Sequence, residues 1–267
     1  MPDCFRSLGR PAALAACLCF LIAVPAAAQP PLAETPVTPQ FMSRYDFHLS
    51  AAGLVVDDDR FTWDTHLGGD FDLVDYVRGR MTFVADYQAL LGSEFRPFDP
   101  YEGNYTLEAA SSLRVGRAEF VGVLHHVSRH VGDRPKRPAI AWNELDLRLL
   151  HQFAVSGVTI DVRAEAGKVI ARAAVDYSWT SNLDLTIRRA MNPAVGAFGR
   201  ASGQLIGLID PSDRKRQRGG RLEGGLRLSG QGGALELFLG VERVIDADPF
   251  DGLTRQWAFA GFRLVTK

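Results

Sequence analysis

The sequence contains little cysteine: its three cysteines, Cys4, Cys17 and Cys19, all lie within the first twenty residues. The remainder of the chain therefore has no disulfide or thiolate chemistry available. The sequence also lacks an excess of charge of one sign, because 30 basic residues nearly balance 31 acidic residues. Without a strongly basic character, nucleic acid is not expected as a partner.

Long apolar runs are also missing. No stretch of about 18 apolar residues follows the N-terminal segment, so no transmembrane helix is predicted there. The N-terminal segment itself is typical of an export signal, with basic residues at Arg6 and Arg10, an apolar region from Ala12 to Val24 and three alanines before Gln29. We therefore predict a cleavable signal peptide at residues 1–28, which directs the chain to the periplasm or the outer membrane.

Two further features surround the predicted cleavage point. A lipobox at Leu14–Cys17 is an alternative to it, but that cut would leave about six apolar residues before the cysteine, short of the roughly 7–15 that a signal needs. Residues 29–40 (QPPLAETPVTPQ) are rich in proline and are predicted to form a flexible leader.

From Phe41 onward, apolar and polar residues alternate with a period of two, which is typical of β-strands. Between Phe61 and Leu73, for example, the odd positions are mostly apolar and the even positions mostly polar or charged. The segment 197–208 alternates least clearly. The pattern predicts about twelve strands, near residues 43–54, 60–74, 78–91, 103–115, 118–130, 141–155, 158–170, 174–190, 197–208, 220–229, 234–244 and 255–265.

The connections between these segments alternate in length. Tight turns, such as Gly116-Arg117 and Ser156-Gly157, alternate with longer polar loops, such as Gly92–Glu102 and Asp246–Thr254. Tight turns on one rim and long loops on the other are typical of transmembrane barrels, whose strands must close because lipid cannot bond to backbone amides. Residues 41–267 are thus predicted to form an all-β, antiparallel up-and-down barrel in the outer membrane. A soluble exported β-domain is the alternative.

The end of the chain bears on how such a barrel is inserted. Many outer-membrane barrels end in an aromatic residue that the insertion machinery reads, and that machinery is an expected partner. This chain ends in WAFAGFRLVTK, so Trp257, Phe259 and Phe262 provide a similar strand, but Lys267 stands in the last position.

One predicted hairpin concentrates residues of catalytic character. Its arms run from Glu119 to His130 and from Ala141 to Leu150. On the first arm, His126 and Ser128 share one face of the strand and lie about 6–7 Å apart. A serine activated by an imidazole also needs a polar group that orients the imidazole. Asn143 on the second arm is the candidate for that role.

The turn before the hairpin predicts which way these side chains face. Val115–Ala118 suits a two-residue turn with glycine at its first central position, and this turn pairs Leu113 with Phe120. Because Leu113 lies on the apolar face, the histidine, serine and asparagine of the hairpin are predicted to face lipid near the long-loop rim. A register slip of one residue would turn the histidine and serine to the lumen instead, opposite Glu144 and Asp146.

These residues resemble the site of outer-membrane phospholipase A, a twelve-stranded barrel whose Ser–His–Asn group faces lipid and usually needs calcium. The resemblance implies that Ser128 is the nucleophile, His126 the base and Asn143 the orienting residue, with Trp142-Asn143 similar to a Trp-Asn pair of that family. Lipid A deacylases use a related His-x-Ser with a glutamate, and Glu144 is the candidate for that variant.

The resemblance has limits in the neighbouring residues. The phospholipase pattern continues Ser-Asn-Gly, whereas Ser128 is followed by Arg129 and His130, and the spacing to Asn143 is longer. The stretch HHVSRHVGDRP is also similar to uncharacterised outer-membrane proteins that carry H-x-S-S-H-x-G-D-E. A second His-x-Ser, His48-Leu49-Ser50, lies on the polar face of the first strand.

The sequence predicts no metal site. His126 and His130 are about 13 Å apart on a strand and cannot share one ion, while His125 points to the opposite face. A site in this hairpin would need Asp133 or a residue from another strand. Two basic loop tips are predicted either to bind lipopolysaccharide phosphates or, as we prefer, simply to be solvated: Arg134, Lys136 and Arg137 in one, and Arg214, Lys215, Arg216 and Arg218 in the other.

Two classes of function therefore remain open. The first is an outer-membrane barrel with a structural, transport or envelope role, in which twelve strands leave a narrow lumen that side chains can fill. The second is a lipid acyl hydrolase that uses Ser128 and His126 on outer-membrane lipid or lipopolysaccharide. No cofactor is predicted, apart from calcium if the protein is phospholipase-like.

Overall fold

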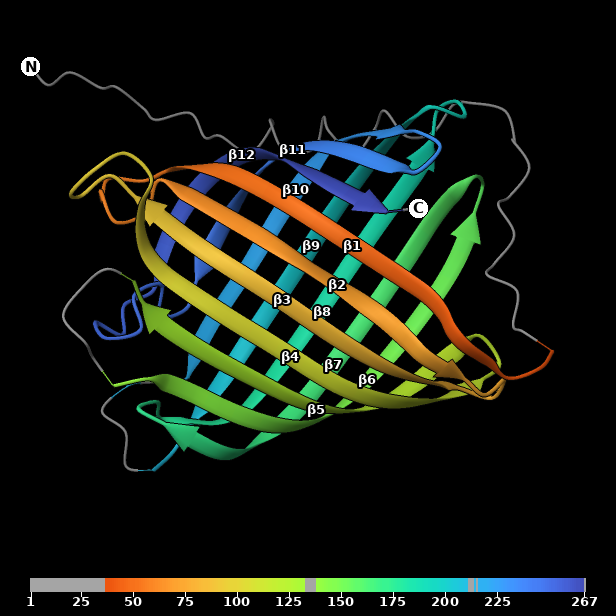
Figure 1. Ribbon diagram of the computed structural model, residues 1–267, viewed down its shortest axis with the longest axis horizontal. Coiled ribbons are helices and arrows are strands. Elements are labelled where there is room, and N and C mark those ends of the chain that lie inside the picture. The colour runs from red at the N-terminus through yellow and green to blue at the C-terminus, as the bar shows by residue number, and fades with distance from the viewer. Residues whose placement is uncertain (1–36, 133–137, 211–213, 215, 267) are drawn as a thin grey trace, which may run out of the picture.

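The computed structural model describes residues 37–132, 138–210, 214 and 216–266 as a closed barrel of twelve antiparallel strands (Figure 1). Each strand pairs with its neighbours in the sequence, and the first strand closes the barrel by pairing with the last. The strands are β1 (Gln40–Val55), β2 (Trp63–Asp75), β3 (Arg80–Gly92), β4 (Asp99–Val115), β5 (Ala118–Val131), β6 (Ile140–Val155), β7 (Val158–Ala173), β8 (Tyr177–Ala190), β9 (Val195–Leu208), β10 (Gln217–Ser229), β11 (Gly233–Val244) and β12 (Arg255–Thr266).

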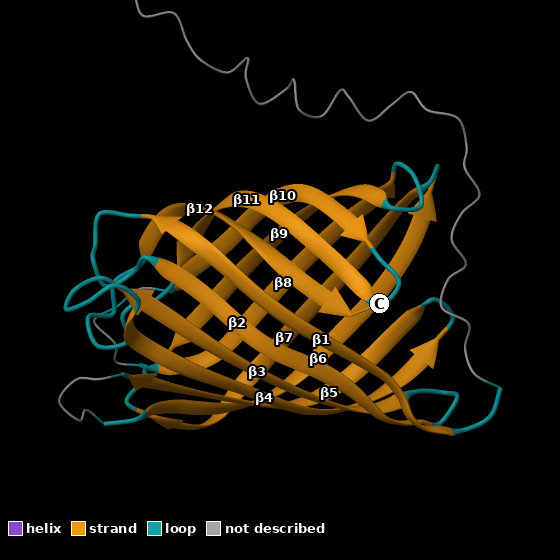
Figure 2. Ribbon diagram, turned by 45° about the horizontal axis from the view of Figure 1, so that its top comes forward, coloured by secondary structure: helices purple, strands orange, loops and turns teal. Residues whose placement is uncertain are grey.

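This architecture confirms the predicted fold class and each predicted strand. The part of the chain that the structure describes contains only strands and their connections (Figure 2), and no helix there could span a membrane. The predicted signal peptide at 1–28 lies outside the described residues, as does most of the predicted leader at 29–40. Gln40, the last leader residue, already begins β1.

The strand with the weakest alternation, β9, forms because both of its edges are paired. It bonds to β8 on one side and to β10 on the other. Its outward positions are small, with Gly199, Ala201 and Gly203, so they give little hydrophobic signal. Phe198 and Arg200 occupy inward positions and contact interior residues. A closed sheet thus imposes strand structure where the local sequence is ambiguous.

The two rims of the barrel differ as expected. Figure 1 shows compact turns and the C-terminus at one end, and longer loops at the other. Gly116 and Gly157 have positive φ values of 61° and 75° in two of the tight turns, a conformation that glycine adopts without a steric penalty. On the loop rim, the connection between β7 and β8 is the short exception, with three residues between the strands.

The outer face is apolar and the lumen is charged. Large apolar side chains such as Leu147 and Leu239 are 76% and 69% exposed on the outside, where lipid would cover them. Inward positions on the same strands carry charge instead, including Asp146 beside Leu147 and Glu236 on β11. This partition is that of a membrane barrel, since a soluble sandwich would bury its apolar face.

Glu236 is the centre of the lumenal ion pairs on the β9–β12 side. Its carboxylate is fully buried and contacts three guanidinium groups, those of Arg200 at 2.9 Å, Arg227 at 2.8 Å and Arg263 at 2.9 Å. Glu223 accepts further bonds from Arg200 and Arg263. Charges buried in this way are tolerated because each is paired and hydrogen-bonded.

Aromatic side chains fill the lumen towards the loop rim. Phe61 is fully buried and packs its ring against Tyr101 of β4 at 5.3 Å and against Trp257 of β12 at 5.7 Å between centroids. Phe198 of β9 and Phe238 of β11 belong to the same buried cluster. Side chains from widely separated strands therefore meet inside the barrel.

The first and last loops of this rim are held together by charge. Arg60 bonds to Asp58 at 2.8 Å in its own loop and to Asp248 at 2.5 Å in the loop before β12. The hydrogen bonds from Arg60 hold the pKa of Asp58 below its ordinary value of 3.8. This loop network covers the aromatic cluster from the outside.

Replacing Glu236 by Gln should reduce the free energy of unfolding by about 1–3 kcal/mol, because three partly buried guanidinium groups would lose a shared charge partner, although two of them keep Glu223. Urea unfolding in phospholipid vesicles, followed by tryptophan fluorescence, measures this loss. Asp57→Asn, at an exposed loop position, is the control and should unfold as the wild type does. Equal midpoints for E236Q and wild type would contradict a structural role for the network.

Acid should weaken the loop network through Asp58. A carboxylate with a lowered folded pKa stabilises the folded state above its unfolded pKa, and this contribution is lost as the pH falls through the folded value. The wild type should therefore lose more stability than Asp58→Asn when the pH is lowered from 6 to below 3.8. Unfolding midpoints of both proteins at the two pH values measure the difference, and parallel losses would contradict the assignment.

Candidate functional site

The pairing of β4, β5 and β6 places the predicted site residues on the outer face. Leu113 lies opposite Phe120, as the turn predicted, and His126 lies directly opposite Asn143. Phe120 is 53% exposed on the lipid side. Residues at every second position of a strand point to the same face, so the even-numbered residues of β5 share the face of Phe120. His126 and Ser128 therefore face outward, and the register prediction is confirmed.

His126 and Asn143 form a direct cross-strand contact. The distance between Nδ1 of His126 and Oδ1 of Asn143 is 2.6 Å. Because a carbonyl oxygen can only accept a hydrogen bond, Nδ1 carries the proton and donates it. The other ring nitrogen, Nε2, is then left with a free lone pair. This arrangement gives the imidazole the tautomer that a general base requires.

Ser128 bonds to a different imidazole. Its Oγ lies 2.8 Å from Nε2 of His130, two residues further along β5. The His130 ring in turn packs edge-on against Tyr105 at 5.8 Å, and Tyr105 packs against Tyr87 at 5.0 Å. The sequence interpretation did not include His130 in the site, although the alternation H-x-S-x-H already places all three side chains on one face.

The group lies close to the loop rim. Ser128 pairs with Ala141, the second residue of β6, and β5 ends at Val131. At about 3.3 Å per residue, Ser128 is roughly 10 Å from that end of the strand. The Tyr87 and Tyr105 side chains beside it correspond to the aromatic belt that barrels place at the membrane–water boundary.

Glu144, the alternative orienting residue, is not brought to His126. It is only 2% exposed, lies on the lumen side of β6 and accepts a hydrogen bond of 2.7 Å from Thr180. The residue after the serine also points inward: Arg129 pairs with Glu102 at 2.5 Å and donates to the backbone oxygen of Asp246. Arg129 therefore anchors β5 to the loop before β12.

The second His-x-Ser is a lumenal feature. His48 Nε2 lies 2.7 Å from Asp86 Oδ2, and Ser50 is only 8% exposed. His66 bonds to the same carboxylate at 2.9 Å. A lipid substrate on the outer face cannot reach this motif, so the shared sequence pattern has two different environments in one barrel.

The basic loop tips are only partly within the described residues. Arg134, Lys136, Arg137 and Lys215 lie outside them. Arg214 pairs with Asp176 at 3.1 Å and with Asp246 at 2.5 Å, which raises the pKa of Arg214 despite its partial burial, and Arg216 stacks over the ring of Trp179. Arg214 therefore pairs with acidic residues of neighbouring loops, and for the other basic residues simple solvation, with phosphate binding as the alternative, stays a prediction.

Calcium does not fit the described residues around Ser128. Within the described ranges, the cluster of three side chains able to hold a metal ion is His125, Glu144 and Asp146, on the other face of the sheet. Asp133, the acidic residue that the sequence offered from the loop, lies outside the described residues. Calcium is therefore assigned no step in the chemistry of Ser128.

Comparison with known proteins identifies the type of barrel. No protein-family model and no curated protein matches the sequence. The fold is similar to outer membrane phospholipase A from Escherichia coli, with a TM-score of 0.53 and 12% identity over 84% of this chain and 97% of that one. The phospholipase dimer with bound calcium from Salmonella typhi gives 0.51 and 13% identity, over 87% and 93% of the two chains.

A third structure, LpxR from Salmonella typhimurium, has a TM-score of 0.46 and 10% identity over 82% of this chain and 99% of that one. At these identities the comparisons define the fold alone. That fold, together with the apolar outer face, makes the chain an outer-membrane β-barrel.

The facing of adjacent histidines can be tested by single-cysteine labelling. The chain without residues 1–28 has no cysteine. In vesicles, a fluorophore on His126→Cys should be quenched by spin-labelled lipid, and one on His125→Cys should not. Leu147→Cys, at an exposed outward position, is the positive control. Equal quenching at 125 and 126 would show that the two side chains do not face opposite sides of β5.

Proposed function

We propose that the protein is a lipid acyl hydrolase of the outer membrane, with Ser128 as nucleophile, His126 as base and Asn143 as the residue that orients the base. One observation carries this proposal. The His126–Asn143 hydrogen bond of 2.6 Å lies on the lipid-facing side of the barrel, with the Ser128 hydroxyl on the same strand and the same face.

The polar side chains of this group lie on the lipid-facing surface, which is an unusual location for them. Polar side chains on the lipid face of a barrel reduce its stability, most strongly near the middle of the bilayer. The next outward residues of β5 and β6 on the side away from the loop rim are apolar: Leu124 and Leu145 lie opposite each other and are 49% and 56% exposed. A cluster of histidines, a serine and an asparagine in this position is best explained by contact with a polar part of a lipid.

The chemistry follows from the tautomer of His126. The Ser128 Oγ attacks the carbonyl carbon of an acyl ester while its proton passes to Nε2 of His126. That proton then goes to the departing alcohol oxygen, which leaves an acyl-serine ester. Water hydrolyses this ester by the same route and releases a fatty acid. Asn143 keeps the ring aligned and accepts the Nδ1 hydrogen bond throughout.

The proposed reaction requires the Ser128 hydroxyl to leave the partner that it contacts in the structure. Ser128 Oγ is bonded to His130 in the resting structure. For the reaction, the serine side chain must adopt another staggered rotamer that directs its hydroxyl towards His126, the other imidazole on this face of β5. His126 is preferred as the base because it has an orienting partner, whereas the contacts of His130 with described residues are the hydrogen bond to Ser128 and the ring contact with Tyr105.

The alternative role as a solute pore is less well supported. Phe61, Tyr101 and Trp257 meet inside the barrel, and Arg60 ties two loops together above them. If hydrolysis is absent, a structural or envelope role is therefore a better description than transport.

Ser128→Ala should abolish fatty acid release. We expect the refolded protein to hydrolyse phospholipid or lipid A in mixed micelles, and the variant to lose at least about a thousandfold in rate. Ser50→Ala, in the lumenal His-x-Ser, is the matched control and should keep wild-type activity. Assays with calcium and with a chelator are run in parallel. No release by folded wild-type protein from either substrate would disprove the proposal.

The same assay assigns the base. His126→Ala should lose about a hundredfold or more, the usual contribution of a general base, while His130→Ala should lose less than about tenfold. Asn143→Ala should fall between the serine and His130 variants, because it orients the base without exchanging a proton. The opposite order for the two histidines would overturn the role given to His126.

A further inference from the structure

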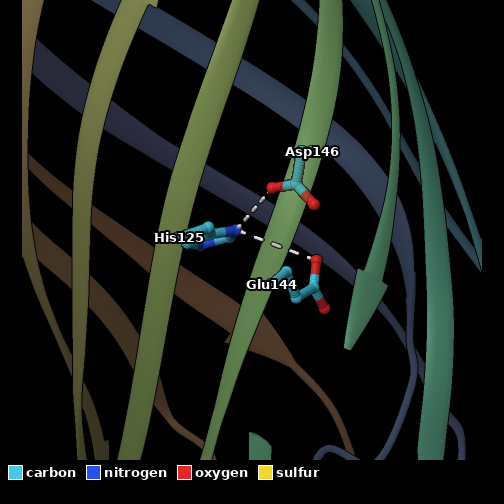
Figure 3. Close-up of side chains that lie close together, drawn as sticks. All are labelled: His125, Glu144 and Asp146. Atoms are coloured by element: carbon cyan, nitrogen blue, oxygen red, sulfur yellow. Dashed lines mark ion pairs between the residues drawn. The ribbon is translucent and has the colours of Figure 1, made fainter. Parts of the chain in front are cut away.

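A second group of titratable side chains lies on the lumen side of the same hairpin. His125 of β5 faces Glu144 and Asp146 of β6 (Figure 3). Nδ1 of His125 is 3.6 Å from Oδ2 of Asp146 and 4.0 Å from Oε2 of Glu144, and one ligand atom from each residue lies within 4.8 Å of the others. This group is independent of the proposed hydrolase site on the outer face.

The polar atoms of this group are buried without hydrogen-bond partners. The Asp146 side chain is 0% exposed, yet neither of its oxygens has a hydrogen bond among the described residues, and the same holds for Oε1 of Glu144 and both ring nitrogens of His125. A buried polar atom without a hydrogen bond destabilises the folded state, and the two long ion pairs of His125 do not replace the missing hydrogen bonds. A ligand held by all three side chains would supply them with a partner.

The neighbouring cation does not supply that partner. Arg148 is already engaged by Glu108 at 2.7 Å and by Glu165. The other histidine cluster of the lumen provides a contrast, because His48 and His66 share the Asp86 carboxylate at 2.7 and 2.9 Å and His66 also lies 3.2 Å from Asp64. Those side chains satisfy one another, whereas the His125 group does not.

We propose that His125, Glu144 and Asp146 bind one divalent transition metal ion inside the barrel. One imidazole nitrogen and two carboxylate oxygens are ligands that suit Zn²⁺, Mn²⁺ or Fe²⁺. Ligand atoms about 2.1 Å from a tetrahedral ion are roughly 3.4 Å from each other. The distances of 3.6 Å from His125 to Asp146 and 4.0 Å from His125 to Glu144 are near this value, and the ligand atoms lie within 4.8 Å of one another, so side-chain movements of up to about 1.4 Å would close the site around an ion.

The surroundings fix the carboxylates in place. Thr180 donates a hydrogen bond of 2.7 Å to Oε2 of Glu144, which orients that ligand as outer-shell residues do in metal sites. Asp146 lies opposite Gly167 of β7, where an added Cβ would be 1.5 Å from Oδ1. The glycine thus provides the space that the carboxylate occupies, and a larger residue there would displace it.

Metal titration of the refolded, untagged chain tests the site. Metal-free protein in detergent should bind one equivalent of Zn²⁺ or Mn²⁺ by calorimetry, and its thermal unfolding midpoint should rise with added metal. Asp146→Asn and His125→Ala should weaken binding by more than about 100-fold. His48→Ala, which removes a lumenal imidazole from the satisfied cluster, is the matched control and should bind as the wild type does.

Two outcomes would overturn the metal site: no binding by the folded wild type, or equal binding by wild type and Asp146→Asn. If a direct ligand variant fails to fold, Gly167→Ala provides a second test, since it displaces the Asp146 carboxylate without removing it and should also weaken binding. Failure of metal binding is distinct from failure of the hydrolase, which is measured by fatty acid release and Ser128.

Discussion

The structure depends on one constraint: no backbone amide may remain unpaired in lipid. Twelve strands meet it by closing on themselves through the β1–β12 pairing. Closure then fixes the face of every residue, because each position of a paired strand points either to lipid or to the lumen. His125 and His126 are adjacent in the chain, yet His125 faces the lumen and His126 faces the lipid.

The ion pairs in the lumen are a consequence of the same closure. Many inward positions carry charged side chains. Because these side chains lie in a narrow lumen, each needs a partner of opposite charge on a neighbouring strand. Glu236 with its three arginines, and Arg148 with Glu108 and Glu165, show how completely most of them are paired. Against this background, Asp146 is an exception that requires an explanation, because neither of its buried oxygens accepts a hydrogen bond from the residues that the structure describes.

Much of this could be predicted from the sequence, because alternation and turn length are local signals. They gave all twelve strands, the Leu113–Phe120 register and the outward facing of His126 and Ser128. The partner of Ser128 depends on a side-chain rotamer, which no local pattern encodes. Phe61 contacts Trp257, and Arg60 contacts Asp248, because the loops fold over the end of a closed barrel. The alternation of apolar and polar residues could not predict these long-range contacts.

The hairpin residues were placed correctly on the sheet, and they use both faces because successive residues of β5 and β6 alternate between lipid and lumen. The next strand, β7, adds an irregularity beside them. The register between β6 and β7 shifts between Asn143 and Glu144, where the partners change from Ala171 to Val169. Such bulges bend a strand and re-aim its side chains, often beside functional sites. Here the extra residue, Ile170, belongs to β7 and lies opposite the step from Asn143, on the outer face, to Glu144, on the lumen side. The irregularity therefore changes the β6–β7 pairing beside both groups while the hydrogen-bonded wall between lipid and lumen stays closed.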